Sequence, residues 1–116
     1  MKPTLYGIRN CDTMKKARAW LDAEGVAYDF HDYKTAGIDE ARLRGWAGEL
    51  GWEKLVNRSG TTFRKLPDVD REGLDEDRAI ALMLAQPSMI KRPVLDTGDR
   101  RLVGFSEAAY RKALGE

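Results

Sequence analysis

The first third of the chain contains two short apolar runs separated by a segment with helical periodicity. The run Lys2–Ile8 predicts a buried strand, and the partly alternating run Val26–Tyr33 predicts a second one. Between them, four apolar residues at helical spacing predict a helix over Thr13–Glu24, which Gly25 ends. These residues are Met14, Ala17, Trp20 and Leu21. Because a helix that crosses between neighbouring strands normally joins parallel strands, we expect a parallel pair here.

The middle of the chain has the apolar pattern of helices. Asp39 is a candidate N-cap for one helix, and Asp75 opens a further helix that ends before Pro87. The basic segment Thr61–Leu66 favours no particular element. We therefore expect a helical insertion over approximately residues 36–88, packed on the same core as the rest of the chain.

The last third has the pattern of a β-hairpin followed by a helix. Val94 and Leu95 precede a turn at Asp96–Asp99, and a second apolar run follows that turn. Ser106 is a candidate N-cap for the last helix. The order strand–helix–strand, helical insertion, strand–strand–helix predicts an α/β protein with a thioredoxin-like fold, organised as a single domain over residues 1–116.

Composition excludes several functional classes. The chain has 20 basic and 19 acidic residues, a net charge of +1, so we expect no nucleic-acid partner. No apolar run is long enough to span a membrane and no signal-peptide pattern is present, so we expect a cytoplasmic protein without membrane contact. One cysteine and one histidine are too few for a zinc site, so no metal is expected.

The single cysteine, Cys11, lies between the first predicted strand and the first predicted helix. A helix N-terminus lowers the pKa of a thiol, and the nearby Arg9, Lys15 and Lys16 add positive charge. The alternative is a small buried cysteine that only packs. The position favours a reactive thiol.

Three motifs carry a resemblance to a known family. They are YGIRNCDTMKKA at the start, LVNRSGTTFRKL in the middle and IKRPVLDTGDRRLVGFSE near the end. With these motifs the chain resembles the arsenate reductase-like (ArsC/Spx) family of thioredoxin-fold proteins, and most closely its YffB branch.

The resemblance implies a set of site residues. Cys11 occupies the place of the cysteine that attacks the oxyanion in arsenate reductases, and Arg58 and Arg92 match two arginines that help to bind the anion. Pro93 matches the cis-proline beside the active cysteine. A third arginine of the reductases is absent, because Gly104 stands in its place. Arsenate binding should therefore be weakened.

The resemblance also suggests how Cys11 is regenerated. Met14 stands where a CxxC motif has its second cysteine, so an external thiol must resolve any disulfide at Cys11. We expect a glutathione-dependent monothiol oxidoreductase that acts on a small-molecule or protein disulfide, with glutathione or another thiol as co-substrate and no tightly bound cofactor. Asn10 and the backbone N–H groups after Cys11 are expected to stabilise charge at the sulfur. We expect a monomer.

Two alternatives remain open. An Spx-like regulatory adaptor that binds RNA polymerase would use the same fold without catalysis, and a true arsenate reductase would work despite the missing arginine. Arg58, taken without the resemblance, is an ordinary solvated loop arginine. His31 is expected on a strand face without a catalytic role.

Overall fold

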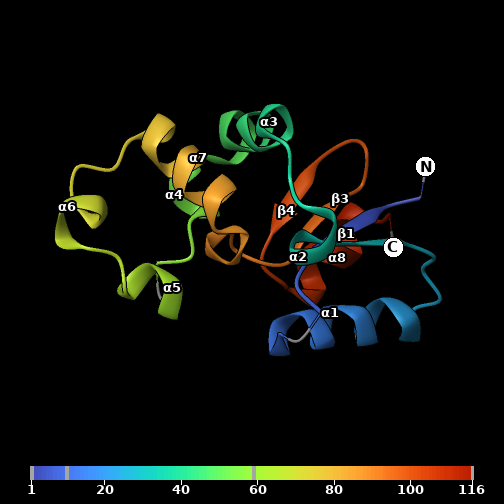
Figure 1. Ribbon diagram of the computed structural model, residues 1–116. Helices are drawn as coiled ribbons and strands as arrows, with labels where there is room; N and C mark the ends of the chain where they lie inside the picture. The colour runs from blue at the N-terminus through green and yellow to red at the C-terminus, as the bar shows by residue number, and fades with distance from the viewer. Residues whose placement is uncertain (1, 10, 59, 116) are drawn as a thin grey trace. The chain divides into compact units, whose positions relative to one another are not determined.

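A four-stranded sheet organises the two ends of the chain in the computed structural model, which describes residues 2–9, 11–58 and 60–115 (Figure 1). The strand order is β2-β1-β3-β4. The strands are β1 (Thr4–Gly7), β2 (Asp29–Asp32), β3 (Val94–Asp96) and β4 (Arg101–Val103). β1 pairs in parallel with β2 and antiparallel with β3, and β3 pairs antiparallel with β4. The predicted α/β arrangement of strand–helix–strand followed by strand–strand–helix is confirmed.

Helices connect and follow these strands. In chain order they are α1 (Asp12–Ala23), α2 (Tyr33–Ala36), α3 (Glu40–Leu50), α4 (Trp52–Leu55), α5 (Thr61–Arg64), α6 (Asp68–Arg71), α7 (Glu76–Ala85), the 3-10 helix η1 (Pro87–Met89) and α8 (Glu107–Ala113). The long helices were predicted. The single-turn helices α2, α4, α5 and α6 were not, because four residues are too short to leave a periodic apolar pattern.

The chain divides into two compact units. The first unit consists of Met1–Ala36 and Arg92–Glu116 and holds the sheet. The second unit is Gly37–Lys91 and is helical. That the whole chain forms one domain stays a prediction.

The core of the first unit lies on the face of the sheet that packs against α1 and α8. Strand pairing places Leu5 beside Leu95, and both are fully buried. The ring of Trp20 in α1 meets that of Tyr110 in α8 edge to face, with centroids 5.9 Å apart. Cys11 is partly buried against this cluster. The first turn of α1 is therefore tied to the core by packing.

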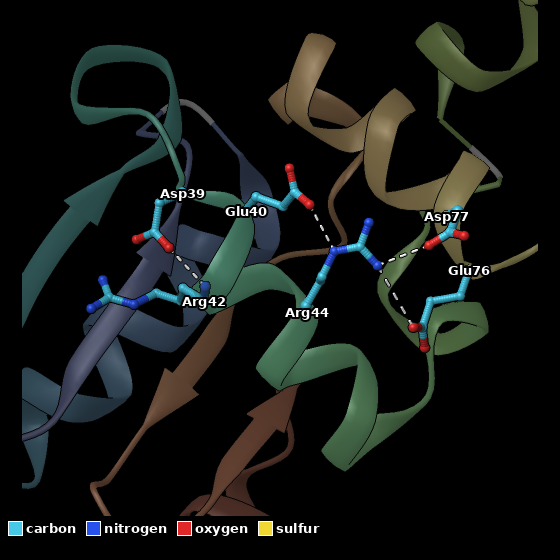
Figure 2. Close-up of polar contacts among 6 residues, drawn as sticks. All are labelled: Asp39, Glu40, Arg42, Arg44, Glu76 and Asp77. Carbon is cyan, nitrogen blue, oxygen red and sulfur yellow. Dashed lines mark hydrogen bonds and ion pairs between the residues drawn. The ribbon is translucent and has the colours of Figure 1, made fainter.

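The second unit is held together by α3 and α7. Their buried residues include Leu43, Trp46, Ile80 and Met83. On the exposed side, Arg44 donates to Glu40 in its own helix at 2.8 Å and to Asp77 of α7 at 2.9 Å (Figure 2). Glu76 lies 4.0 Å from the same guanidinium.

The second predicted strand is shorter than expected. The sequence predicted a strand over Val26–Tyr33, whereas β2 covers Asp29–Asp32. The carboxylate of Asp32 accepts a hydrogen bond from the N–H of Lys34 at 2.8 Å, which turns the chain and starts α2 at Tyr33. This local side-chain hydrogen bond ends the strand.

Candidate functional site

Cys11 is the N-cap residue of α1. Its backbone is extended, with φ −129° and ψ 132°, while its carbonyl oxygen already accepts the helical hydrogen bond from the N–H of Lys15 at 2.9 Å. The side chain is therefore placed at the N-terminus of a 12-residue helix. The unpaired N–H groups and the dipole of such a terminus favour negative charge.

The environment of Cys11 lowers the pKa of its thiol. Burial alone raises that pKa, but the lowering contributions outweigh it. The backbone N–H of Met14 acts most strongly, followed by a hydrogen bond from the Arg92 side chain and by the N–H of Thr13. The charge of Arg92 adds to the effect. The two N–H groups belong to the first turn of α1, so the start of the helix and Arg92 together favour the thiolate.

Arg92 and Pro93 come from the segment that enters β3. The Arg92–Pro93 peptide bond is cis, as the family resemblance implies. The carbonyl of Pro93 accepts a hydrogen bond from the N–H of Gly104 at 2.8 Å, which anchors this segment to the end of the hairpin. Cys11, Arg92 and Pro93 thus all belong to the first unit, and Arg92 contacts the thiol.

Met14 fills the position where a CxxC motif has its second cysteine. It is fully buried and packs on Gly7, where an added Cβ would lie 2.2 Å from the Met14 sulfur. The residue is part of the core under Cys11. Because Cys11 is the only cysteine of the chain, no intramolecular disulfide can form.

The structure does not place the other predicted site residues beside Cys11. Arg58 belongs to the second unit, where its guanidinium carbon lies 5.7 Å from the centroid of the Trp52 ring. Its approach to Cys11 stays a prediction. Asn10 lies outside the described residues. Gly104 has a φ of +81°, a conformation that glycine adopts readily and that arginine at this position would adopt only with strain.

Tyr33 is not among the site residues predicted from the sequence. Its side chain is 1% exposed, and its ring packs near those of Tyr6 and His31. In the sequence, a tyrosine at the end of an apolar run looks the same as an ordinary core residue. The sequence predicted Tyr33 as the last residue of the second strand, and only the structure shows that it lies directly after β2.

No group of three or more histidine, cysteine, aspartate or glutamate side chains arranged to hold a metal occurs within residues 2–9, 11–58 and 60–115. In the same part of the chain, no helix has the length and apolar character needed to cross a membrane.

The fold and this site define a thioredoxin-like protein with one thiol at the start of its first helix. A model of the ArsC family matches residues 6–113, and the chain belongs to that family. The predicted resemblance to arsenate reductases, Spx and the YffB branch is confirmed.

Three relatives illustrate the range of the family. A solved structure of a protein named YffB is 63% identical and has a TM-score of 0.94, with 97% of this chain and 99% of that one covered. An arsenate reductase (ArsC) related protein from Brucella melitensis is 52% identical, with a TM-score of 0.79 and coverage of 100% and 97%. The global transcriptional regulator Spx of Streptococcus mutans is 30% identical over 96% of this chain and 82% of its own.

Proposed function

We propose that this protein is a glutathione-dependent monothiol oxidoreductase in which Cys11 is the nucleophile. The observation that carries the proposal is the environment of Cys11, a helix N-cap thiol with a lowered pKa and a hydrogen bond from Arg92. The thiolate is the reactive form of cysteine, so each contribution that lowers the pKa raises the reactive fraction at neutral pH.

The reaction proceeds by two thiol–disulfide exchanges. In the first, the Cys11 thiolate attacks the glutathione sulfur of a mixed disulfide between glutathione and a substrate thiol. The Cys11–glutathione disulfide forms, the original disulfide breaks, and the substrate leaves as a thiolate that takes a proton from solvent. A second glutathione thiolate then attacks the bound glutathione sulfur, which releases the Cys11 thiolate and oxidised glutathione.

The remaining site residues have supporting roles in this proposal. Arg92 stabilises the thiolate and holds an anionic group such as a glutathione carboxylate. The anion-binding role that the family resemblance implies for Arg58 stays a prediction. Asn10 and the N–H groups at the start of α1 stabilise charge on the sulfur as it attacks and leaves. Met14 makes the second exchange depend on an external thiol, because it offers no resolving sulfur.

The test measures glutathione-dependent reduction of a glutathionylated peptide by wild type and by Cys11→Ser. We expect the variant to lose the catalysed rate, since a hydroxyl does not form the mixed disulfide. Met14→Leu is a matched control that changes a neighbouring side chain in the core but keeps the thiol. Undiminished activity of folded Cys11→Ser would show that Cys11 is not the nucleophile.

An adaptor role is the second candidate, favoured by the 30% identity to Spx over nearly the whole chain. Met14 counts against it, because a redox-sensing CxxC pair is missing. Retention of the purified protein on immobilised RNA polymerase at physiological salt would support this role. Arsenate reduction is disfavoured by Gly104, and failure to restore growth of an arsenate-sensitive strain that lacks its reductase would count further against it.

A further inference from the structure

We propose that the Tyr33 hydroxyl acts with Arg92 as a hydrogen-bond donor for an anionic group of the substrate that reacts at Cys11. This inference rests on the proposed function of Cys11 and adds a specificity-determining residue to the same site. The ligand chemistry is a carboxylate carried close to the reacting atom.

Strand register brings Tyr33 and Arg92 to the same end of the sheet, where β1 finishes. β1 pairs with β2 up to Gly7 and Asp32, and Tyr33 is the next residue of the β2 chain. On the other side of β1, Tyr6 pairs with Val94, so Arg92 lies at the end where β1 leads on to Cys11. Both residues therefore lie at the carboxyl end of β1, where a site of an open α/β sheet is expected.

The Tyr33 hydroxyl is buried without a visible use. Among the residues that the structure describes, its oxygen has no hydrogen-bond partner, although the side chain is only 1% exposed. Aromatic packing holds the ring in place, since its centroid lies 6.4 Å from those of both Tyr6 and His31. A buried polar group without a partner is costly, and such groups in folded proteins call for an explanation.

The charge near the hydroxyl supports a donor role. Burial raises the pKa of Tyr33 far above its ordinary value, so the phenol keeps its proton at neutral pH. The positive charge of Arg92 acts on the same hydroxyl, and Arg92 also hydrogen-bonds to the Cys11 sulfur. Arg92 therefore acts on both the Tyr33 hydroxyl and the Cys11 sulfur, and a hydroxyl donor beside a guanidinium is suited to an anion and disfavours a cation.

A packing role for Tyr33 makes a different prediction from a ligand-binding role. Tyr33→Phe keeps the ring and removes only the hydroxyl. Because that hydroxyl has no partner in the free protein, the variant should unfold at the same temperature as wild type or at a higher one. Tyr33→Phe should slow the reaction of Cys11 with an anionic reagent and leave its reaction with a neutral reagent unchanged.

The experiment compares alkylation of Cys11 at pH 7 by iodoacetate, which carries a carboxylate, and by neutral iodoacetamide. We expect the ratio of the iodoacetate rate to the iodoacetamide rate to be higher for wild type than for N-acetylcysteine. In Tyr33→Phe this ratio should fall by about tenfold, the scale of one hydrogen bond to a charged group. Tyr28→Phe is the matched control, because Tyr28 is a half-buried tyrosine whose hydroxyl accepts from Arg18 in the same unit.

Three outcomes would overturn the inference: a wild-type ratio equal to that of N-acetylcysteine, a ratio unchanged in Tyr33→Phe, or an equal fall in both variants. The first of these needs no variant and so does not depend on the folding of Tyr33→Phe. The proposed function fails separately if the iodoacetamide rate of wild type at pH 7 does not exceed that of N-acetylcysteine, because that rate reports the thiolate and not the anion site.

Discussion

At the scale of single residues, Arg92 is one of the groups that lower the pKa of the Cys11 thiol, after the backbone N–H of Met14. Arg92→Met removes a hydrogen bond and a positive charge from the thiolate, so the pKa of Cys11 should rise. We expect alkylation by iodoacetamide at pH 7 to slow by about three- to tenfold, as the thiolate fraction falls. The measurement is the alkylation rate between pH 5 and 10, from which the pKa of Cys11 is obtained.

Lys91→Met is the control for this change, because it removes the same charge from the neighbouring exposed residue. Its pH profile should match that of wild type. An equal shift in the pKa of Cys11 in both variants would mean that Arg92 acts only as one more positive charge and makes no specific contact with the thiolate.

Gly7 is required by the close approach of Met14. In Gly7→Ala the new methyl group would lie 2.2 Å from the Met14 sulfur, and Met14 is fully buried. We expect the free energy of unfolding to fall by about 1–3 kcal/mol, the usual cost of overpacking a core. Urea denaturation measures this change.

Gly48→Ala in α3 is the opposite case. An added Cβ at this helical position meets nothing within 4 Å, so the substitution should stabilise by about 0.5–1 kcal/mol through helix propensity. If Gly7→Ala did not lower the free energy of unfolding relative to Gly48→Ala, Met14 would not be packed tightly on Gly7.

At the scale of elements, a side-chain cap sets the start of α7. The Asp75 carboxylate accepts a hydrogen bond from the N–H of Arg78 at 2.9 Å. Asp75→Ala should lower the free energy of unfolding by about 0.5–2 kcal/mol, whereas Asp75→Asn keeps an acceptor and should cost much less. Urea denaturation of the two variants distinguishes a cap from a merely exposed aspartate, for which the two losses would be equal.

The elements that were predicted from sequence are those with local determinants. Asp39 and Ser106 were predicted as N-caps and Asp75 as the start of a helix, and each accepts a capping hydrogen bond from a backbone N–H. The predicted bounds of the second strand were wrong mainly at its start, since β2 begins at Asp29 and not at Val26, and the hydrogen bond from Lys34 to Asp32 ends it one residue before the predicted Tyr33. Apolar periodicity does not report such a turn.

At the scale of the whole molecule, the thiol links folding to pH. The folded state has the lower pKa for Cys11, so the thiolate contributes stability fully above the unfolded pKa of about 8.5, and this contribution is lost as pH falls through the folded pKa. The difference in unfolding free energy between wild type and Cys11→Ser should therefore shift in favour of wild type as pH rises from 5 to 9. Urea denaturation at several pH values measures it, and a difference independent of pH would contradict the lowered pKa.

Local stability should differ strongly along the chain. The four residues of α6 include none that is buried, whereas β1 and β3 hold the fully buried Leu5 and Leu95. We expect peptides covering Asp68–Arg71 to exchange amide hydrogens with solvent far sooner than peptides covering Thr4–Gly7. Hydrogen exchange followed by mass spectrometry tests this, and equal protection of the two segments would contradict it.

The sequence by itself determined the order of the main elements, the place of Cys11 between β1 and α1, and the family. Each depends on nearest neighbours along the chain, such as apolar spacing, caps and short motifs, which are local properties. Even the lack of a resolving thiol follows from the single cysteine.

Only the tertiary structure decided which distant segments meet at the end of β1, since Arg92 was expected near Cys11 from the family resemblance and not from a local pattern. Arg92 and Tyr33 are 81 and 22 residues from Cys11 in the sequence, and strand pairing brings both to the end of β1. The burial of the Tyr33 hydroxyl and the fit of Met14 on Gly7 likewise depend on packing between distant segments. Local sequence patterns do not predict such contacts, because these contacts form only when the sheet assembles.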